Sequence, residues 1–477
     1  MEDVLGKIVS LLWGWPLLIG VLAVGLYFTI GSGFWQFRYF GHALKYVFSN
    51  IKREKTQGEG ILSSFEAVSV ATAGAIGVGN IGGVASAIAL GGPGAVFWMW
   101  ITALVGMMTK MVEVTLAVHY RDKRPNGETY GGPTYYLEKG WAKEKGLPGW
   151  KILAVIFGAG IFLTFFLTMQ TYTVSEAISV TFNLNHLGVA TVYAFLFLYP
   201  IVLGGIPRVG RFASYIVPFM ALFYVIAGLI IILMNISQLP QTFALIFKHA
   251  FTPMAAIGGF GGATFAMAFR MGIARAVYSN EAGWGSSPMA HATASVDHPV
   301  KQGMWGIFEV FVDTIIVCSI TALVIIITGA WQTGLSGAEL TLTAFERSIG
   351  YWGKVIVTLG VFLFGWTTST GWYSYYETLL RHAFRNNKKV EEGFLKVYRF
   401  LYPIPGWGMV VLATTIGMPP AIVWLFADIT TAVPTYVNLL AILVLGGKFY
   451  ELLRDYNSKY LGYDRIDTGQ PTKLFYE

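Results

Sequence analysis

The segment Thr72–Gly83 reads TAGAIGVGNIGG and places five glycines inside an apolar run that extends from about Ile61 to Leu90. A transmembrane helix needs roughly 20 apolar residues, so this run is long enough to cross a bilayer. Each glycine in a helix interior costs about 1 kcal/mol relative to alanine, which weakens the centre of the helix. The sequence therefore predicts a membrane helix that unwinds at mid-membrane, where the freed backbone must line a cavity rather than lipid.

Two other interpretations of this segment have to be considered. Gly77, Gly79 and Gly82 match the GxGxxG pattern of dinucleotide sites, which must follow a strand and precede an acidic residue by about 20 positions. Here the pattern lies inside an apolar span and the nearest acidic residue downstream is Glu113, which argues against a dinucleotide site. Close packing of helices through small residues would also explain the glycines, and only the rest of the chain can decide between packing and a break.

The composition is that of a polytopic membrane protein, because 55% of the 477 residues are hydrophobic and only 12% are charged. Cys318 is the single cysteine, which excludes a disulfide framework and a cysteine metal site. The first apolar run lacks a basic flank and a small-residue cleavage site, so we expect a retained helix. About 11 spans are expected, near residues 11–31, 61–90, 94–118, 152–182, 187–204, 213–236, 256–276, 303–330, 355–380, 400–417 and 421–447.

Basic residues divide unevenly between the two sets of loops that these spans create. Apart from Lys110 inside a span, most Lys and Arg residues fall in the loops of one side. Basic loops stay cytoplasmic, so we expect an extracellular N-terminus and a cytoplasmic C-terminus in the plasma membrane. The net charge of +7 therefore reflects orientation rather than nucleic-acid binding. The basic residues expected on the extracellular side are Lys7, Lys248, Arg347 and Lys354.

The spans beyond the first form two halves of five. A second glycine-rich run, AIGGFGGATFAMAFRMG at 256–272, opens the second half, and the halves enter the membrane from opposite sides because five is odd. Broken helices at equivalent positions of inverted halves point to a midplane binding site in a secondary transporter, which favours a break over packing. The expected divisions are an extra helix with a basic segment (1–60), a first repeat (61–236), an extracellular connector (237–255), a second repeat (256–447) and a cytoplasmic tail (448–477).

Polar residues inside the spans are functional candidates by default. Gln170 lies among apolar residues, with a helix–helix hydrogen bond as the alternative role. Thr367–Thr370 supplies four successive hydroxyls, and those of Thr367 and Thr368, with carbonyls freed by the break, could replace the water shell of a small cation. Glu309, Asp313 and Asp428 could relay protons or could pair with basic and hydroxyl groups.

Three other polar features are expected to be structural. Lys110 and Glu113 are spaced for an ion pair on one helix face. The segment NEAGWGSSPMAHATA (280–294) is expected to be a cytoplasmic loop, in which His291 is hydrogen-bonded rather than metal-bound. A short amphipathic helix is expected near 134–145.

Half-helix N-termini carry about half a positive charge and half-helix C-termini about half a negative charge. An unwound pair of helices therefore suits a zwitterion, whose carboxylate would lie at a half-helix N-terminus and whose ammonium would lie at a half-helix C-terminus. No Walker A sequence is present, so ATP is not an expected energy source.

GGPGAVFWMWITALVGM (91–107) together with NEAGWGSSPMAHATA resembles the alanine/glycine:cation symporter (sodium:alanine symporter) family of the amino acid–polyamine–organocation group. The resemblance implies an all-α membrane protein with one extra N-terminal helix and an inverted 5+5 repeat, as in neurotransmitter:sodium symporters, whose first and sixth core helices are broken. GVGN (77–80) is similar to the broken first helix of those symporters, but the Arg-Phe-Pro that follows there is missing. The gating arginine of that wider group is therefore not carried over.

The resemblance also implies site residues. The carbonyls of Ala73 and Ile76 with Thr367 and Thr368 match a sodium site, and Asn80 and Thr264 align with ligands of a second one. The backbone of Gly77–Gly79 would face the substrate carboxylate, with Gln170 above it. The expected substrate-binding residues are Thr72, Ala75, Gly77, Val78, Gly79, Asn80, Gln170, Phe265, Ala266, Phe269 and Trp366.

The sequence predicts a transporter rather than an enzyme: a sodium-coupled symporter that imports alanine or glycine by alternating access. Sodium is the expected co-transported ion, and no organic cofactor, ATP or nucleic acid is expected. Proton coupling on the same fold is the main alternative. A channel would need a continuous polar stripe along one helix, and a membrane enzyme would need a nucleophile–base pair, so both have less support.

Overall fold

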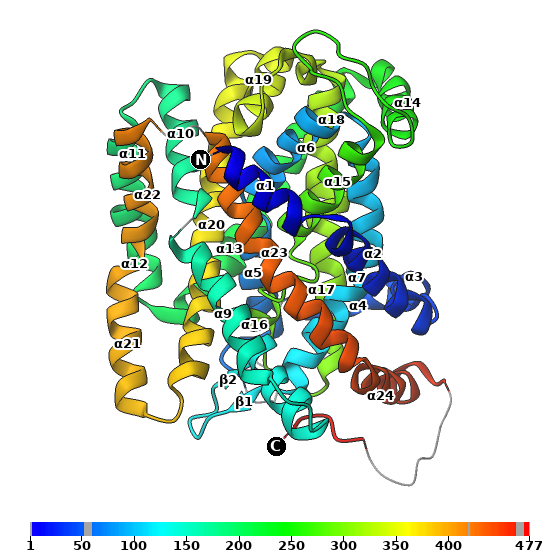
Figure 1. The fold of residues 1–477 in the computed structure, drawn as a ribbon, viewed down its shortest axis with the longest axis vertical. Helices are drawn as coiled ribbons and strands as arrows, with labels where there is room; N and C mark the ends of the chain where they lie inside the picture. The colour runs from blue at the N-terminus through cyan, green and yellow to red at the C-terminus, as the bar shows by residue number, and fades with distance from the viewer. Residues whose placement is uncertain (1, 52–59, 167, 418–419, 464–471, 477) are drawn as a thin grey trace.

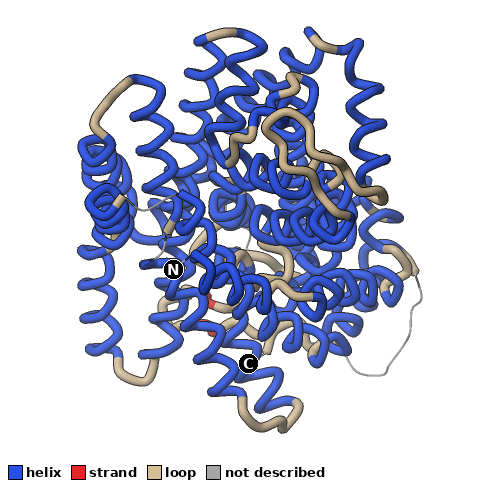
Figure 2. Tube along the Cα trace, turned by 45° about the horizontal axis from the view of Figure 1, so that its top comes forward, coloured by secondary structure: helices blue, strands red, loops and turns tan. Residues whose placement is uncertain are grey.

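The computed structural model describes residues 2–51, 60–166, 168–417, 420–463 and 472–476. The described chain is a bundle of helices (Figure 1), and Figure 2 shows how little of it is loop or strand. The single sheet of the described chain is a hairpin of β1 (Asp122–Lys123) and β2 (Thr129–Tyr130). The predicted helical character is confirmed, because the described chain is mostly helical.

The helices fall into those before and those after the connector. The first group is α1 (Glu2–Leu12), α2 (Trp15–Gly31), α3 (Trp35–Arg38), α4 (Phe40–Asn50), α5 (Ser64–Ala75), η1 (Gly79–Gly83), α6 (Val84–Gly91), α7 (Ala95–His119), α8 (Pro133–Tyr136), η2 (Leu137–Glu144), α9 (Trp150–Phe166), α10 (Met169–Phe182), α11 (His186–Val192), η3 (Tyr193–Leu198), α12 (Tyr199–Val202) and α13 (Gly205–Met234). The second group is η4 (Ile236–Gln238), α14 (Leu239–His249), α15 (Phe265–Asn280), α16 (Pro288–His291), α17 (Pro299–Val310), η5 (Phe311–Cys318), α18 (Ser319–Ile327), η6 (Ala330–Thr333), α19 (Gly337–Ile349), α20 (Tyr351–Phe384), α21 (Lys388–Leu401), α22 (Pro403–Ile416), α23 (Pro420–Val444), α24 (Gly446–Tyr456) and η7 (Asn457–Leu461).

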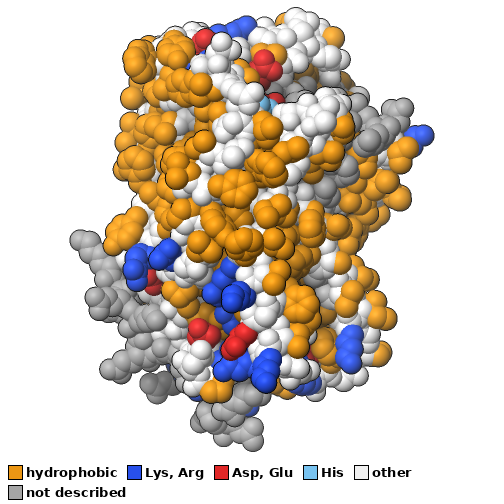
Figure 3. All heavy atoms as spheres, turned by 90° about the vertical axis from the view of Figure 1, so that its left-hand side faces the viewer, with side chains coloured by type: hydrophobic (Ala, Val, Ile, Leu, Met, Phe, Trp, Pro, Cys, Tyr) orange, Lys and Arg blue, Asp and Glu red, His pale blue; other side chains and the backbone are white. Residues whose placement is uncertain are grey.

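Among the described residues, six helices are long and apolar enough to cross a membrane, and two bent helix pairs raise the number to eight. Two shorter apolar helices, His186–Val202 and Pro403–Ile416, coincide with further expected spans. Figure 3 shows hydrophobic side chains over most of one face, with Lys and Arg gathered toward its lower end. We call this the basic end; it carries α21 and α24, whereas α14 and α19 lie at the opposite end (Figure 1).

The first glycine-rich helix is interrupted as predicted. Ser63 caps α5 by accepting a hydrogen bond from the Glu66 amide, and α5 ends at Ala75. The π-helical turn η1 begins at Gly79, and the two halves meet at 46°. A side chain at Gly74 or Gly77 would collide with α20, so close packing accompanies the break rather than replacing it.

The second interruption lies elsewhere than predicted. Residues 256–264 are not helical, because this segment forms an irregular hairpin in which Met254 pairs with Ala263. The helix α15 begins only at Phe265, so the expected span 256–276 starts too early and the connector extends past residue 255. The interruption falls at residues 281–287, inside the segment that was expected to be a cytoplasmic loop. That segment is apolar because it is buried in the protein.

The third expected core span, 152–182, also consists of two helices. The first, α9, ends at Phe166, and α10 begins at Met169 with Thr168 as its N-cap. The amphipathic helix expected near 134–145 is present as α8 and η2. Parts of two expected cytoplasmic segments, 52–59 and 464–471, lie outside the described residues.

Candidate functional site

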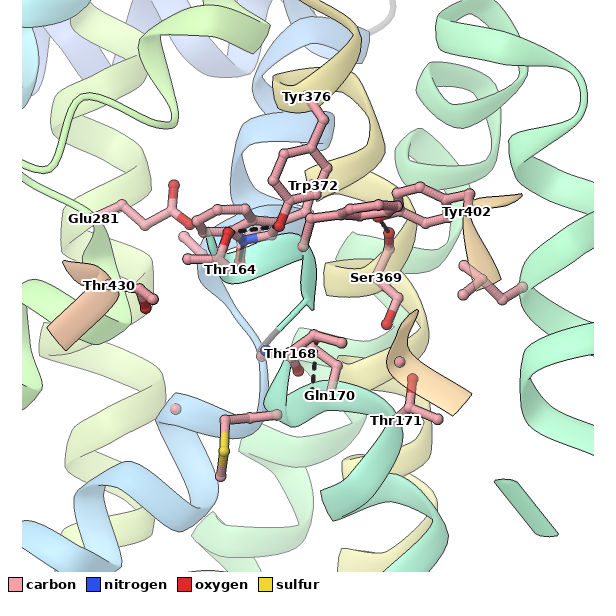
Figure 4. Close-up of a pocket in the computed structure, with 18 of the residues that line it drawn as sticks. Thr164, Thr168, Gln170, Thr171, Glu281, Ser369, Trp372, Tyr376, Tyr402 and Thr430 are labelled. Carbon is pink, nitrogen blue, oxygen red and sulfur yellow. Dashed lines mark hydrogen bonds between the residues drawn. The ribbon is translucent and has the colours of Figure 1, made fainter. Parts of the chain in front are cut away.

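A cavity lies where the interrupted helices face one another (Figure 4). The space between its walls is about 740 Å³, a figure that includes open solvent at its mouth. Side chains from α9, α10, α15, α20, α22 and α23 line it, with backbone from α5 and η1. The lining side chains are Thr164, Phe165, Thr168, Met169, Gln170, Thr171, Leu198, Tyr278, Glu281, Trp284, Ser369, Trp372, Tyr376, Tyr402, Pro403 and Thr430, and the other lining residues are Gly74, Ala75, Gly77, Gly79 and Gly406.

The α10 side of the cavity is rich in hydroxyl groups. Figure 4 shows Thr168 and Gln170 together on this wall, where the Thr168 hydroxyl accepts a weak hydrogen bond of 3.4 Å from the backbone N–H of Gln170. The Thr164 hydroxyl is 2.6 Å from that of Tyr376, which joins α9 to α20. The side-chain oxygen of Gln170 has no hydrogen-bond partner among the described residues. The structure thus places the predicted Gln170 in the wall of the cavity.

The first break contributes backbone to the same cavity. The amide of Gly77 donates to the Asn80 side-chain oxygen at 2.9 Å, so this amide is already used inside the protein. The hydrogen bonds between described residues leave the Val78 and Gly79 amides without an acceptor. Those two amides, at the N-terminal end of η1, are therefore the donors that the break offers to an anion.

The residues expected at the sodium site separate into two groups. Thr368 faces the break, and its hydroxyl donates to the Ile76 carbonyl at 3.2 Å. Thr367 instead contacts the Met220 sulfur at 3.2 Å and bonds to carbonyls of its own helix. Ala73 is buried in the last turns of α5. Only Ile76 and Thr368 of the expected set are joined by a hydrogen bond.

The structure does not bring Asn80 and Thr264 together. Thr264 caps the start of α15, whereas Asn80 lies near its end, and a helix of this length spans roughly 24 Å. The Asn80 amide group donates to Asp313 at 2.6 Å. Ser279 and Thr314 donate to the same carboxylate at 3.0 and 2.7 Å. Asp313 is thus a fully buried carboxylate with three side-chain donors and no ion pair among the described residues.

Several expected substrate residues lie outside the cavity. Phe265 and Phe269 pack near Trp98 in the first turns of α15, and Ala266 lies between them on the same helix. Trp366 donates its indole N–H to the Phe197 carbonyl, away from the cavity. On this side the cavity is lined instead by residues at and beyond the end of α15: Tyr278, Glu281 and Trp284. Thr72 is buried in α5, and like Val78 it is absent from the lining.

Sequence reasoning missed Glu281 and Trp284, which line the cavity from the second break. Glu281 follows the last residue of α15 and has a φ of 55°, a left-handed conformation that is uncommon for a residue other than glycine. Trp284 packs on Trp372 with ring centroids 5.0 Å apart. The available signal was the composition of NEAGWGSSPMAHATA, which is too apolar for a solvated loop.

A buried ionic network holds the second break in place. Lys110 lies 3.6 Å from Glu113 and 3.6 Å from Glu309, and all three side chains are fully buried. Glu113 accepts from the Gly283 amide at 3.3 Å. Glu309 accepts from Ser287 at 3.0 Å. The predicted Lys110–Glu113 ion pair is confirmed, and the network ties residues 281–287 to α7 and α17.

His291 belongs to the same network. Its Nε2 lies 2.9 Å from Glu309 and its Nδ1 lies 2.8 Å from the Gln302 amide group. Because that amide group donates to Nδ1, the Nε2 nitrogen carries the proton that bonds Glu309. The predicted hydrogen-bonded role of His291 is confirmed.

Asp428, whose partner the sequence did not reveal, pairs with Arg275. The two side chains form a bidentate ion pair between α15 and α23, with N–O distances of 2.7 and 2.9 Å. Both residues line a second hollow toward the end that carries α19, which we call the vestibule. Tyr278 and Thr430, slightly further along the same helices, line the central cavity. The ion pair therefore lies between the vestibule and the central cavity.

Two proteins with similar sequences are described as alanine transporters. The sodium/alanine symporter AgcS of Methanococcus maripaludis is 40% identical over 446 residues, covering 92% of this chain and 93% of that protein. The putative sodium/proton-dependent alanine carrier protein YrbD of Bacillus subtilis is 35% identical, covering 98% and 95%. Both are transporters rather than enzymes.

The fold resembles that of MhsT, solved in complex with L-phenylalanine, with a TM-score of 0.59 at 13% identity over 83% of this chain and 90% of that one. At this identity the likeness concerns the fold alone. A family model, described as the sodium:alanine symporter family, matches residues 1–465. The chain therefore belongs to the sodium:alanine symporter family.

Proposed function

We propose that this protein is a sodium-coupled symporter that imports alanine or glycine by alternating access. The observation that carries this proposal is one cavity between two non-helical stretches: the bend between α5 and η1, and the residues after the end of α15, which include Glu281 and Trp284. Their ends offer unpaired amides on one side and a carboxylate on the other, which suits a zwitterion. Membership of a sodium-coupled amino-acid symporter family supports the same conclusion.

Small substrates are favoured by the cavity walls. Large rings occupy much of the lining, including Trp284, Trp372 and Tyr376. Trp372 donates its indole N–H to the Gly74 carbonyl at 3.2 Å, which fixes this ring against the broken helix. A substrate with a short side chain fits between such rings with less rearrangement than a bulky one.

The proposed sodium site uses the carbonyls of Ala73 and Ile76 and the hydroxyl of Thr368. Thr368 already approaches Ile76, so a sodium ion would replace one hydrogen bond rather than require a new arrangement. Thr367 is left out of this site because its hydroxyl faces α13. Sodium and substrate would then stabilise the same state of the first break, which couples their affinities.

Alternating access requires a barrier that opens on one side at a time. We assign the extracellular barrier to the Arg275–Asp428 pair, since it separates the vestibule from the central cavity. With this assignment the N-terminus would lie outside and the basic end in the cytoplasm, which is the orientation that the distribution of Lys and Arg predicts.

Uptake of radiolabelled alanine and glycine into proteoliposomes tests the proposal. Uptake should require an inward sodium gradient and should not occur when potassium replaces sodium at symmetric pH. Liposomes without protein provide the background. Equal uptake in potassium buffer would overturn sodium coupling, and absence of uptake for every small neutral amino acid would overturn the substrate.

Proton coupling is the second candidate, and Asp313 is the observation that favours it. A fully buried carboxylate without an ion pair is costly unless it is protonated or binds a cation. The relative YrbD is described as sodium/proton-dependent. Sodium-free uptake driven by an inward proton gradient, and lost in Asp313→Asn, would select this mechanism.

A further inference from the structure

The central cavity has an uneven distribution of charge. Among the described residues that line it, Glu281 is the only charged side chain. The remaining polar groups are hydroxyls, the Gln170 amide and backbone. A zwitterionic ligand in this cavity would therefore meet one carboxyl group at one place and only dipoles elsewhere.

Glu281 is held in position by its neighbours. Its Oε2 atom accepts hydrogen bonds from Ser286 at 2.7 Å and from the Tyr375 hydroxyl at 3.3 Å. Tyr375 also lies 3.4 Å from the Ala71 carbonyl, so one hydroxyl joins the carboxylate to α5. No described residue donates to Oε1. Figure 4 shows the carboxylate at the edge of the cavity, at the level of Trp372.

Lys110 is the buried cation nearest to this part of the chain, and its ion pairs are with Glu113 and Glu309, each at 3.6 Å. Glu281 itself forms no ion pair with any residue that the structure describes. The C-terminal end of α15 adds its negative dipole at the same place.

Another part of the cavity lining favours a negatively charged group. The Gly79 amide at the start of η1 and the first turn of α10 both lie at helix N-termini, which favour an anion. A carboxylate would be stabilised there and repelled by Glu281. The two charges of an amino acid are thus assigned to different parts of the cavity.

We propose that Glu281 binds the ammonium group of the substrate. The transporter would then select ligands that carry an ammonium group over ligands that lack one. This inference rests on the proposed function and deepens it, because it names the residue that recognises one of the two charges. Ser286 and Tyr375 act as positioning residues, since they fix Oε2 and leave Oε1 to the ligand.

The test uses competition against radiolabelled alanine on the purified full chain in sodium buffer. Lactate has the same skeleton with a hydroxyl in place of the ammonium, and alanine methyl ester keeps the ammonium but lacks the carboxylate. In the unaltered protein, lactate should not compete at concentrations where alanine does. Equal competition by lactate and alanine would overturn the inference without any variant.

Glu281→Gln removes the charge and keeps the shape. We expect its alanine affinity to fall about 30-fold or more, as for truncation of one partner of a buried charge pair. Its preference for alanine over lactate should fall by a similar factor, whereas Glu281→Asp should keep the preference. Glu392→Gln, at an exposed position on α21, is the matched control and should bind as the unaltered protein does.

The other outcomes separate the possible failures. Equal losses for alanine and lactate, or unchanged affinity, would overturn the inference. A shift in half-saturating sodium with an unchanged alanine-over-lactate preference would also overturn it and would assign the carboxylate to sodium. If the unaltered protein bound no small amino acid with or without sodium, the proposed function itself would fail.

Discussion

At the scale of single residues, Thr367 and Thr368 are adjacent on α20, but their hydroxyl groups face different neighbours. Consecutive residues on a helix point about 100° apart, so two adjacent hydroxyls cannot face the same neighbour. Thr368 reaches the Ile76 carbonyl across the break, whereas Thr367 faces Met220 on α13. The hydroxyl of Thr370 bonds back to carbonyls of α20. A run of four hydroxyls thus supplies one ligand candidate to the first break.

The two threonines form a matched pair for testing the sodium site. We expect Thr368→Ala to raise the half-saturating sodium concentration for alanine uptake about 10-fold, because it removes one oxygen ligand worth roughly 1.4 kcal/mol. Thr367→Ala removes the same hydroxyl one position away and should change it little. Alanine uptake into proteoliposomes, measured as a function of sodium concentration, tests this prediction. Similar effects of both substitutions would contradict the assignment.

At the scale of elements, side chains from neighbouring helices hold the non-helical residues 281–287 in position. Residues 281–287 do not form a helix, and Glu113 and Glu309 accept hydrogen bonds from the Gly283 amide and the Ser287 hydroxyl. The buried Lys110 balances these carboxylates. The second break is therefore held by α7 and α17, while the Arg275–Asp428 pair links α15 to α23.

The Arg275–Asp428 pair gives a prediction about accessibility. Asp428→Asn should weaken the contact between α15 and α23 and expose the central cavity to the vestibule. A cysteine introduced by Thr430→Cys should then react faster with an impermeant thiol reagent added from outside. Cys318 is buried and should contribute little to the signal.

Glu339→Gln provides the control, because Glu339 lines the vestibule without taking part in the ion pair. It should leave the labelling rate of Thr430→Cys unchanged. Unchanged labelling in Asp428→Asn would contradict the role of the ion pair as a barrier.

At the scale of the whole molecule, the basic end is fastened by ion pairs between the two halves. Glu138 in η2 accepts from His382 at 3.0 Å and from Arg385 near the C-terminal end of α20. Burial raises the pKa of Glu138, but hydrogen bonds from His382, Arg385 and Lys143 outweigh it and hold that pKa well below its usual range. The carboxylate is thus a fixed negative charge that joins η2 to the C-terminal end of α20.

This contact predicts a dependence of stability on pH. A carboxyl whose pKa is depressed by folding stabilises the folded state above its unfolded pKa of about 4.3, and that stability is lost as the pH falls toward the folded pKa. Glu138→Gln should lower the free energy of unfolding by about 1–3 kcal/mol at pH 7, with a smaller loss near pH 4. Thermal unfolding in detergent measures both.

Glu144→Gln is the comparison for that measurement, because Glu144 lies at the end of the same helix η2 and is only partly buried. A loss of stability in Glu138→Gln that did not shrink at low pH would show that the charge of Glu138 is not what joins the halves.

The sequence by itself determined the class of the protein, the position of the first break and the buried role of several polar residues. Glycine lowers helix stability locally, so the interruption before Gly79 could be read from neighbouring residues alone. Lys110 and Glu113 were predicted as a pair because residues three positions apart are neighbours on the surface of a helix. Gln170 was found because an amide in an apolar run needs a partner.

Only the tertiary structure decided where the second break lies and which residues surround the cavity. Residues 256–264 and 280–294 both contain glycine and apolar residues, and local composition cannot tell a surface hairpin from an unwound segment buried in protein. The unwound state at Glu281 depends on carboxylates from α7 and α17, which lie far away in sequence. Contacts of that kind arise from packing, so the chain's own pattern carries no direct signal for them.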